Sequence, residues 1–85
     1  MIEDKKEAAN ALREMAREYQ WSGPEKDMKA MFVQDRKNFR EVASLIRKGD
    51  FSQAMDKASR MDTAAREHIP QDVWDFLVRR SGYVR

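Results

Sequence analysis

The side chains in this sequence that could do chemistry are a single histidine, 15 carboxylates and 17 basic groups, with no cysteine. His68 precedes Ile69 and Pro70, so we expect it to cap a helix end and interact with the helix dipole rather than act as a base. Glu14 and Glu18 lie four residues apart, but a carboxylate metal site in a helical bundle also needs paired Glu-x-x-His elements, which the sequence lacks. The sequence therefore predicts no catalytic residue, no metal site and no cofactor, and hence no enzyme.

Basic side chains gather between residues 24 and 49, where seven of them accompany four acidic ones. A phosphate-facing patch is one interpretation, but a helix surface with charges of both signs is more often simply solvated. The excess over the whole chain is only +2. We therefore expect a solvated surface or the rim of a site for an acidic partner, with nucleic acid as the less favoured ligand. This basic patch consists of Arg36, Lys37, Arg40, Arg47 and Lys48.

The elements that must position these side chains are helices. Apolar residues recur at spacings of three and four along the chain, which is the helical period, and Pro24, Gly49 and Pro70 mark boundaries. Eighty-five residues make a single domain. We expect an all-α fold over residues 1–85, a small helical bundle of three longer helices at about 3–21, 24–48 and 51–68 with a short C-terminal helix at about 70–80.

The second expected helix carries a heptad stripe that is interrupted by one carboxylate. Asp35 stands where the spacing calls for an apolar residue, and a carboxylate in a packing seam needs a partner or water to offset its desolvation. We expect it to fix register or partner choice. A chain this short has little stability to spare and no disulfide, so we expect a homo-oligomer. The oligomer seam would comprise Met28, Phe32, Asp35, Phe39, Val42 and Ile46.

The C-terminal segment is the most apolar part of the chain, and its apolar positions cover more than one face of a short helix. Such a cluster is more often an interface than a solvent face. Elsewhere in the chain, six methionines, whose flexible side chains adapt to a partner, favour a protein-binding function in general. We therefore expect the main partner-binding surface here, formed by Val73, Trp74, Phe76, Leu77, Val78 and Tyr83.

Residues 49–54, Gly-Asp-Phe-Ser-Gln-Ala, offer two interpretations. They resemble the turn between the paired helices of tetratricopeptide repeats, and this likeness, which covers only the turn and its flanks, implies an antiparallel helical hairpin. The alternative is a helix-turn-helix whose second helix would present Ser52, Gln53 and Lys57 to base edges. In that arrangement Asp50 and Asp56 would meet the phosphates, and Leu45 would stand where the motif prefers a small residue. The alternative function is thus a small helical DNA-binding transcriptional regulator that uses residues 36–57.

The preferred function is a small non-enzymatic regulator that binds another protein and modulates or inhibits it. The identity of that protein is not encoded in any motif. If the 85 residues are the whole reading frame, such a chain is typical of inhibitors and antirepressors carried by phages and other mobile elements. No stretch is long and apolar enough to span a membrane, and residues 1–6 lack the order of a signal peptide, so we expect a cytoplasmic protein.

Overall fold

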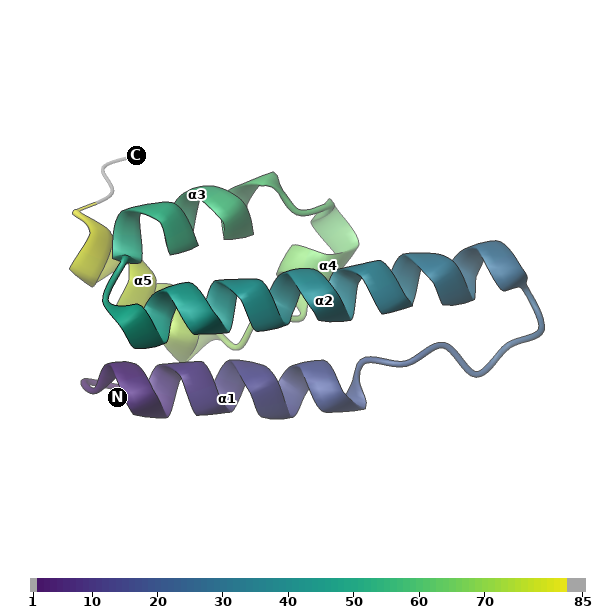
Figure 1. Cartoon of the computed structure of the whole chain (residues 1–85), viewed down its shortest axis with the longest axis horizontal. Helices are drawn as coiled ribbons and strands as arrows, with labels where there is room; N and C mark the ends of the chain where they lie inside the picture. The colour runs from purple at the N-terminus through teal and green to yellow at the C-terminus, as the bar shows by residue number, and fades with distance from the viewer. Residues whose placement is uncertain (1, 83–85) are drawn as a thin grey trace.

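The computed structural model of the chain describes residues 2–82, and this part of it is all-α, as the periodicity predicts (Figure 1). The N-terminal helix is capped by Asp4, whose side chain accepts a hydrogen bond from the backbone N–H of Lys6. The described helices are α1 (Lys5–Glu18), α2 (Lys26–Lys48), α3 (Phe51–Arg60), α4 (Thr63–Glu67) and α5 (Gln71–Ser81).

The connection between α1 and α2 is longer than the sequence predicts. Helix α1 ends at Glu18 rather than near residue 21, and α2 begins at Lys26 rather than at Pro24. The indole Nε1 of Trp21 donates to Oε2 of Glu25 at 3.1 Å, a bond that holds both residues in the connection. Helix α2 then runs back antiparallel to α1 (Figure 1).

The turn after α2 forms the expected helical hairpin. Gly49 takes the left-handed conformation, with φ of 84°, which a residue with a side chain adopts only at a cost. The N–H of Asp50 donates to the carbonyl of Leu45 at 2.9 Å, which satisfies an end group of α2. The side chain of Asp50 then accepts from the N–H of Gln53 and starts α3, which returns alongside α2 (Figure 1).

The expected third helix is two helices rather than one. Met61 is extended, with φ of −66° and ψ of 157°, and separates α3 from α4. The cause is Asp62, whose Oδ1 accepts from the N–H of Ala65 at 2.8 Å and so caps a new helix. The expected count of three longer helices and one short helix is therefore only roughly consistent with the five described helices, and the short helix after Pro70 is present as α5.

The core lies between α1, α2, α3 and α5, and α5 contacts both α1 and α3. Alanines line much of it, so the helices approach closely. At the chain ends, Arg79 donates from Nη2 to the carbonyl of Ile2 at 2.7 Å. The largest fully buried side chains are Phe39, Phe76, Leu12, Ile46, Leu77, Val42 and Val73.

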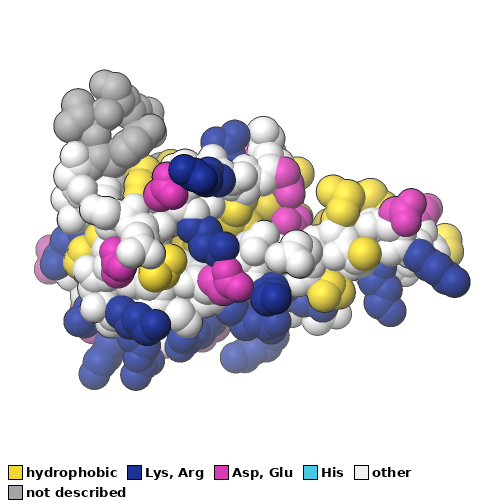
Figure 2. Space-filling model, turned by 45° about the horizontal axis from the view of Figure 1, so that its top comes forward, with side chains coloured by type: hydrophobic (Ala, Val, Ile, Leu, Met, Phe, Trp, Pro, Cys, Tyr) yellow, Lys and Arg dark blue, Asp and Glu magenta, His cyan; other side chains and the backbone are white. Residues whose placement is uncertain are grey.

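The N-terminal end of α2 projects beyond the rest of the bundle (Figure 1). Met31 is 50% exposed and Val33 is 46% exposed on this end, which carries the large apolar side chains most open to solvent among residues 2–82. Figure 2 shows hydrophobic side chains gathered there. We call Met28, Met31 and Val33 the α2 tip.

Candidate functional site

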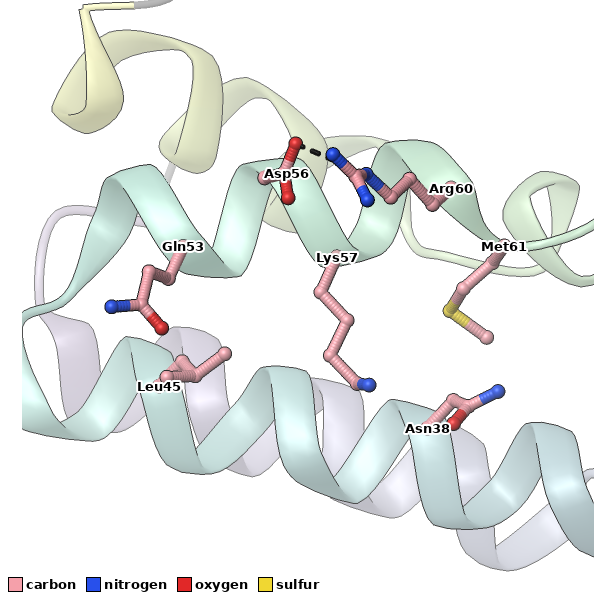
Figure 3. Close-up of a pocket in the computed structure, with 7 residues that line it drawn as sticks. All are labelled: Asn38, Leu45, Gln53, Asp56, Lys57, Arg60 and Met61. Atoms are coloured by element: carbon pink, nitrogen blue, oxygen red, sulfur yellow. Dashed lines mark ion pairs between the residues drawn. The ribbon is translucent and has the colours of Figure 1, made fainter.

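An open groove runs along the seam between the packed helices α2 and α3, and charged side chains of both helices meet in it. Figure 3 shows Lys57 pointing from α3 toward α2, with Leu45 across from Gln53 at one end and Asn38 across from Met61 at the other. This part of the groove encloses about 400 Å³. Its lining residues are Asn38, Leu45, Gln53, Asp56, Lys57, Arg60 and Met61.

A second hollow of about 490 Å³ continues the groove along α2. It shares Leu45 and Lys57 with the first, so the two hollows form one continuous feature, which we call the α2/α3 groove. Most of the additional side chains are basic. The second hollow is lined by Lys37, Arg40, Glu41, Ser44, Leu45, Lys48 and Lys57.

The carboxylates of the groove are engaged with α3 cations. Nζ of Lys57 lies 2.7 Å from Oε2 of Glu41, and the hydrogen bond and charge of this lysine lower the pKa of Glu41. On α3 itself, Nε of Arg60 lies 3.3 Å from Oδ1 of Asp56, and Figure 3 marks this pair. The groove therefore keeps an excess of positive charge on its α2 side.

The structure divides the predicted basic patch. Lys37, Arg40 and Lys48 line the α2/α3 groove together. Arg36 turns toward α1 instead, where its Nη1 donates to the carbonyl of Tyr19 at 3.0 Å. Arg47 is exposed and lies outside the groove lining. The role of the patch stays a prediction, now centred on three of its five members.

The geometry of the hairpin bears on the DNA-binding alternative. In a helix-turn-helix the two helices cross at about 90 to 120°. Here α3 runs back along α2 (Figure 1). Ser52 and Gln53 are exposed, but they follow the cap of a hairpin rather than the start of a helix that stands across its neighbour. DNA binding by residues 36–57 therefore has no helix-turn-helix geometry to support it.

The apolar stripe of α2 packs mainly against its own chain. Phe39, Val42 and Ile46 are fully buried within the bundle, so they have no surface left for a seam between copies of the chain. The assignment of these three residues to an oligomer seam needs correction, because the other helices of the same chain already cover them. Phe32 and Met28 are half-buried and lie toward the projecting end of α2.

Asp35 is buried in the same stripe, only 6% exposed, and its partner is a phenol. The hydroxyl of Tyr19, just beyond α1, donates to Oδ2 of Asp35 at 3.3 Å. Burial raises the pKa of Asp35, and the nearby carboxylate of Asp62 raises it further, whereas the Tyr19 hydrogen bond lowers it. Burial and the charge of Asp35 in turn raise the pKa of Tyr19 to about 12. This cluster joins α1, α2 and α4.

Replacing Asp35 by asparagine should stabilise the protein at pH 7. The folded state holds the Asp35 proton more tightly than the unfolded chain does, because an aspartate in the unfolded chain has a pKa of about 3.9 and folding raises the pKa of Asp35. The native protein therefore loses stability as the pH rises through the folded pKa, and asparagine avoids this loss. We expect a gain on the order of 1 kcal/mol at pH 7 that vanishes below about pH 3.5. Urea unfolding followed by circular dichroism at both pH values measures it.

Glu14→Gln is the matched control for this measurement, because it neutralises an exposed carboxylate on α1. It should change the free energy of unfolding by less than about 0.5 kcal/mol. If Asp35→Asn instead unfolds at a lower urea concentration than wild type at pH 7, the charged form of Asp35 stabilises the fold, which contradicts this prediction.

The C-terminal helix contributes more to the core than the sequence-based interpretation allows. Val73, Phe76 and Leu77 are fully buried, because positions i, i+3 and i+4 share one face of α5. Their assignment to an exposed partner-binding surface needs correction. Trp74 and Val78 are half-buried and pack against the core, so a contact role stays a prediction for these two. Tyr83 lies outside the described residues.

Sequence reasoning did not single out Tyr19 or Glu41 as site residues. Ala8, Leu12, Met15 and Tyr19 follow one another at spacings of four, three and four residues, and this helical period is the signal that could have placed Tyr19 near the core. The pairing of Glu41 with Lys57 joins two helices, and periodicity within one helix carries no information about it.

Within residues 2–82, no group of three or more acidic, histidine or cysteine side chains could hold a metal ion. None of the helices in this part of the chain has the length and apolarity to cross a membrane. No protein-family model, no curated protein and no solved structure matches the chain.

Proposed function

We propose that this protein is a non-enzymatic regulator that binds another protein and modulates or inhibits it. The observation that carries the proposal is the α2 tip, where Met31 and Val33 are about half exposed on a helix end that projects from the bundle (Figure 1). Met28 and Met31 are three residues apart and so share one face of this helix end, whereas Val33 projects from the other side. Exposed apolar side chains on a projecting helix end favour an interface. Methionine suits this role because its side chain adapts to the shape of a partner.

The same tip favours self-association. The rest of the α2 stripe is covered by its own chain, so a contact between two copies would have to use residues near Met28, Met31 and Phe32. We expect a mass above 10.0 kDa in light scattering at micromolar concentration. A mass that stays at the monomer value as the concentration rises would contradict self-association but would leave binding to a different protein intact.

Capture from a lysate of the source organism tests the function. The tagged wild type should retain a defined protein, and the double variant Met28→Lys, Met31→Lys should lose it, because each lysine places a charge in the apolar contact that these two methionines share. Mass spectrometry identifies and quantifies the captured protein. We expect at least a fivefold loss, about 1 kcal/mol, for truncating or charging central interface residues.

Ala30→Lys with Gln34→Lys is the matched control, since both positions are exposed on the same turns of α2 but as a pair face another side of the helix than Met28 and Met31, and the added charge is the same. This control should capture the protein as wild type does. Equal capture by both double variants would contradict a binding role for the tip. Recovery of nucleic acid in place of a defined protein would favour the DNA-binding alternative, for which the cations of the α2/α3 groove are the supporting observation.

A further inference from the structure

The free cations of the α2/α3 groove form a row. Lys37, Ser44 and Lys48 are separated by seven and four residues, so they project from α2 in nearly the same direction, and Arg40 lies beside them. Lys37, Arg40 and Lys48 have no ion pair within residues 2–82. Eleven residues of helix place Lys37 and Lys48 about 16 Å apart along the axis. The charges are therefore spread over three turns and do not converge on one small anion.

The apolar and acidic residues that line the groove restrict the kind of ligand further. Leu45 lines both hollows and is half-buried, so it offers an apolar contact between the cations and α3. Glu41 and Asp56 also line the groove, and a continuous phosphate backbone laid along it would approach both carboxylates. An acidic helix carries its charges at intervals, so it can place carboxylates on the cations and an apolar residue over Leu45.

We propose that the α2/α3 groove binds an acidic amphipathic helix of another protein, with its carboxylates on Lys37, Arg40 and Lys48 and an apolar side chain over Leu45. This inference shares one assumption with the proposed function, namely that the partner is a protein. Its surface differs from the α2 tip, because none of the tip residues lines the groove. Figure 2 shows Lys and Arg side chains along this face, apart from the hydrophobic cluster at the projecting end.

A model peptide tests the groove directly. The probe is a fluorescent helical peptide of about 16 residues, with glutamates along one face and leucines beside them, and a scrambled peptide of the same composition serves as the second probe. Fluorescence anisotropy at low salt measures both affinities. We expect the amphipathic peptide to bind at least about tenfold more tightly to wild type than to the triple variant Lys37→Gln, Arg40→Gln, Lys48→Gln, since three exposed ion pairs are lost.

The matched control removes the same charge elsewhere. Lys6→Gln, Arg17→Gln, Lys29→Gln changes three exposed cations outside the groove and should keep the wild-type affinity within about twofold. Leu45→Gln, shown to be folded by circular dichroism, should weaken the amphipathic peptide about threefold or more, because it removes the apolar contact. The scrambled peptide should bind wild type several-fold more weakly than the amphipathic peptide.

Three results would overturn the proposal. Equal weakening by both triple variants would mean that only net charge attracts the peptide, and equal affinity for the scrambled peptide would mean the same. Tighter binding of a short DNA duplex, lost in the groove variant, would make phosphate the ligand. These results are separate from the capture experiment: a protein lost only by the tip variant supports the proposed function, whereas peptide binding without any captured protein supports the groove alone.

Discussion

Replacing Phe39 by alanine is expected to lower the free energy of unfolding by about 3 to 5 kcal/mol, which is a large share of the stability of a small domain. Phe39 is fully buried in α2, and its ring meets the ring of Tyr19 edge-on with centroids 5.3 Å apart. Alanine would leave a cavity where α1 and α2 pack. Urea unfolding followed by circular dichroism measures the loss, and the variant should be partly unfolded at room temperature.

Val33→Ala is the control, because it also shortens an apolar side chain on α2 but at a position that is 46% exposed. It should change the free energy of unfolding by less than about 0.5 kcal/mol. A Phe39→Ala variant that stayed as stable as wild type, and differed only by dissociating into folded monomers, would place Phe39 between copies of the chain. That outcome would restore the oligomer seam at this position.

Replacing Tyr19 by alanine should have an effect of similar size, about 3 to 5 kcal/mol, although Tyr19 lies outside every helix. Its ring stacks on Phe32 with centroids 4.3 Å apart and meets His68 edge-on at 4.9 Å. Each such aromatic pair adds about 0.5 to 1.5 kcal/mol beyond burial. Removing the ring therefore frees the end of α1 from both α2 and α4.

Tyr19→Phe separates the ring from the hydroxyl. It keeps the stacking but leaves Asp35 without its 3.3 Å donor, so we expect a loss of only about 1 kcal/mol at pH 7. In the Asp35→Asn background this loss should shrink, because asparagine tolerates a missing donor better than a carboxylate does. If phenylalanine costs as much as alanine at this position, the hydroxyl and not the ring holds the three helices together.

The described helices could largely be predicted from the sequence, because local signals set them. The left-handed Gly49 and the apolar period of α2 fix the end and the face of the longest helix. The break after Met61 had a local signal too, since Asp62 is a residue type that favours helix starts, but the alanine-rich stretch around it suggested a continuous helix. The late start of α2 accompanies a hydrogen bond between Trp21 and Glu25 in the connection, and no sequence motif predicts this bond.

The candidate sites were harder to predict, because periodicity indicates that a face is buried but not what buries it. The stripe containing Phe39 is covered by the same chain, and so is the face of α5 that carries Phe76. The partner of Asp35 was equally hidden: Tyr19 lies 16 residues away and beyond the end of α1. The basic patch lay within reach of sequence reasoning, but the groove that gathers Lys37 and Lys48 required the hairpin geometry.

The hydrogen bonds from α5 to the N-terminal segment have a consequence for protein engineering. Arg79 and Arg80 donate to the carbonyls of Ile2 and Glu3, residues 77 positions earlier in the chain, so the described chain closes almost into a ring. Residues 2 and 82 lie at the same end of the molecule, opposite the projecting end of α2 (Figure 1). A tag or fused domain at either terminus would therefore leave the α2 tip clear. A short linker that joined the two termini, with a new opening between residues 22 and 24, would give a circular permutant that keeps every described helix unbroken.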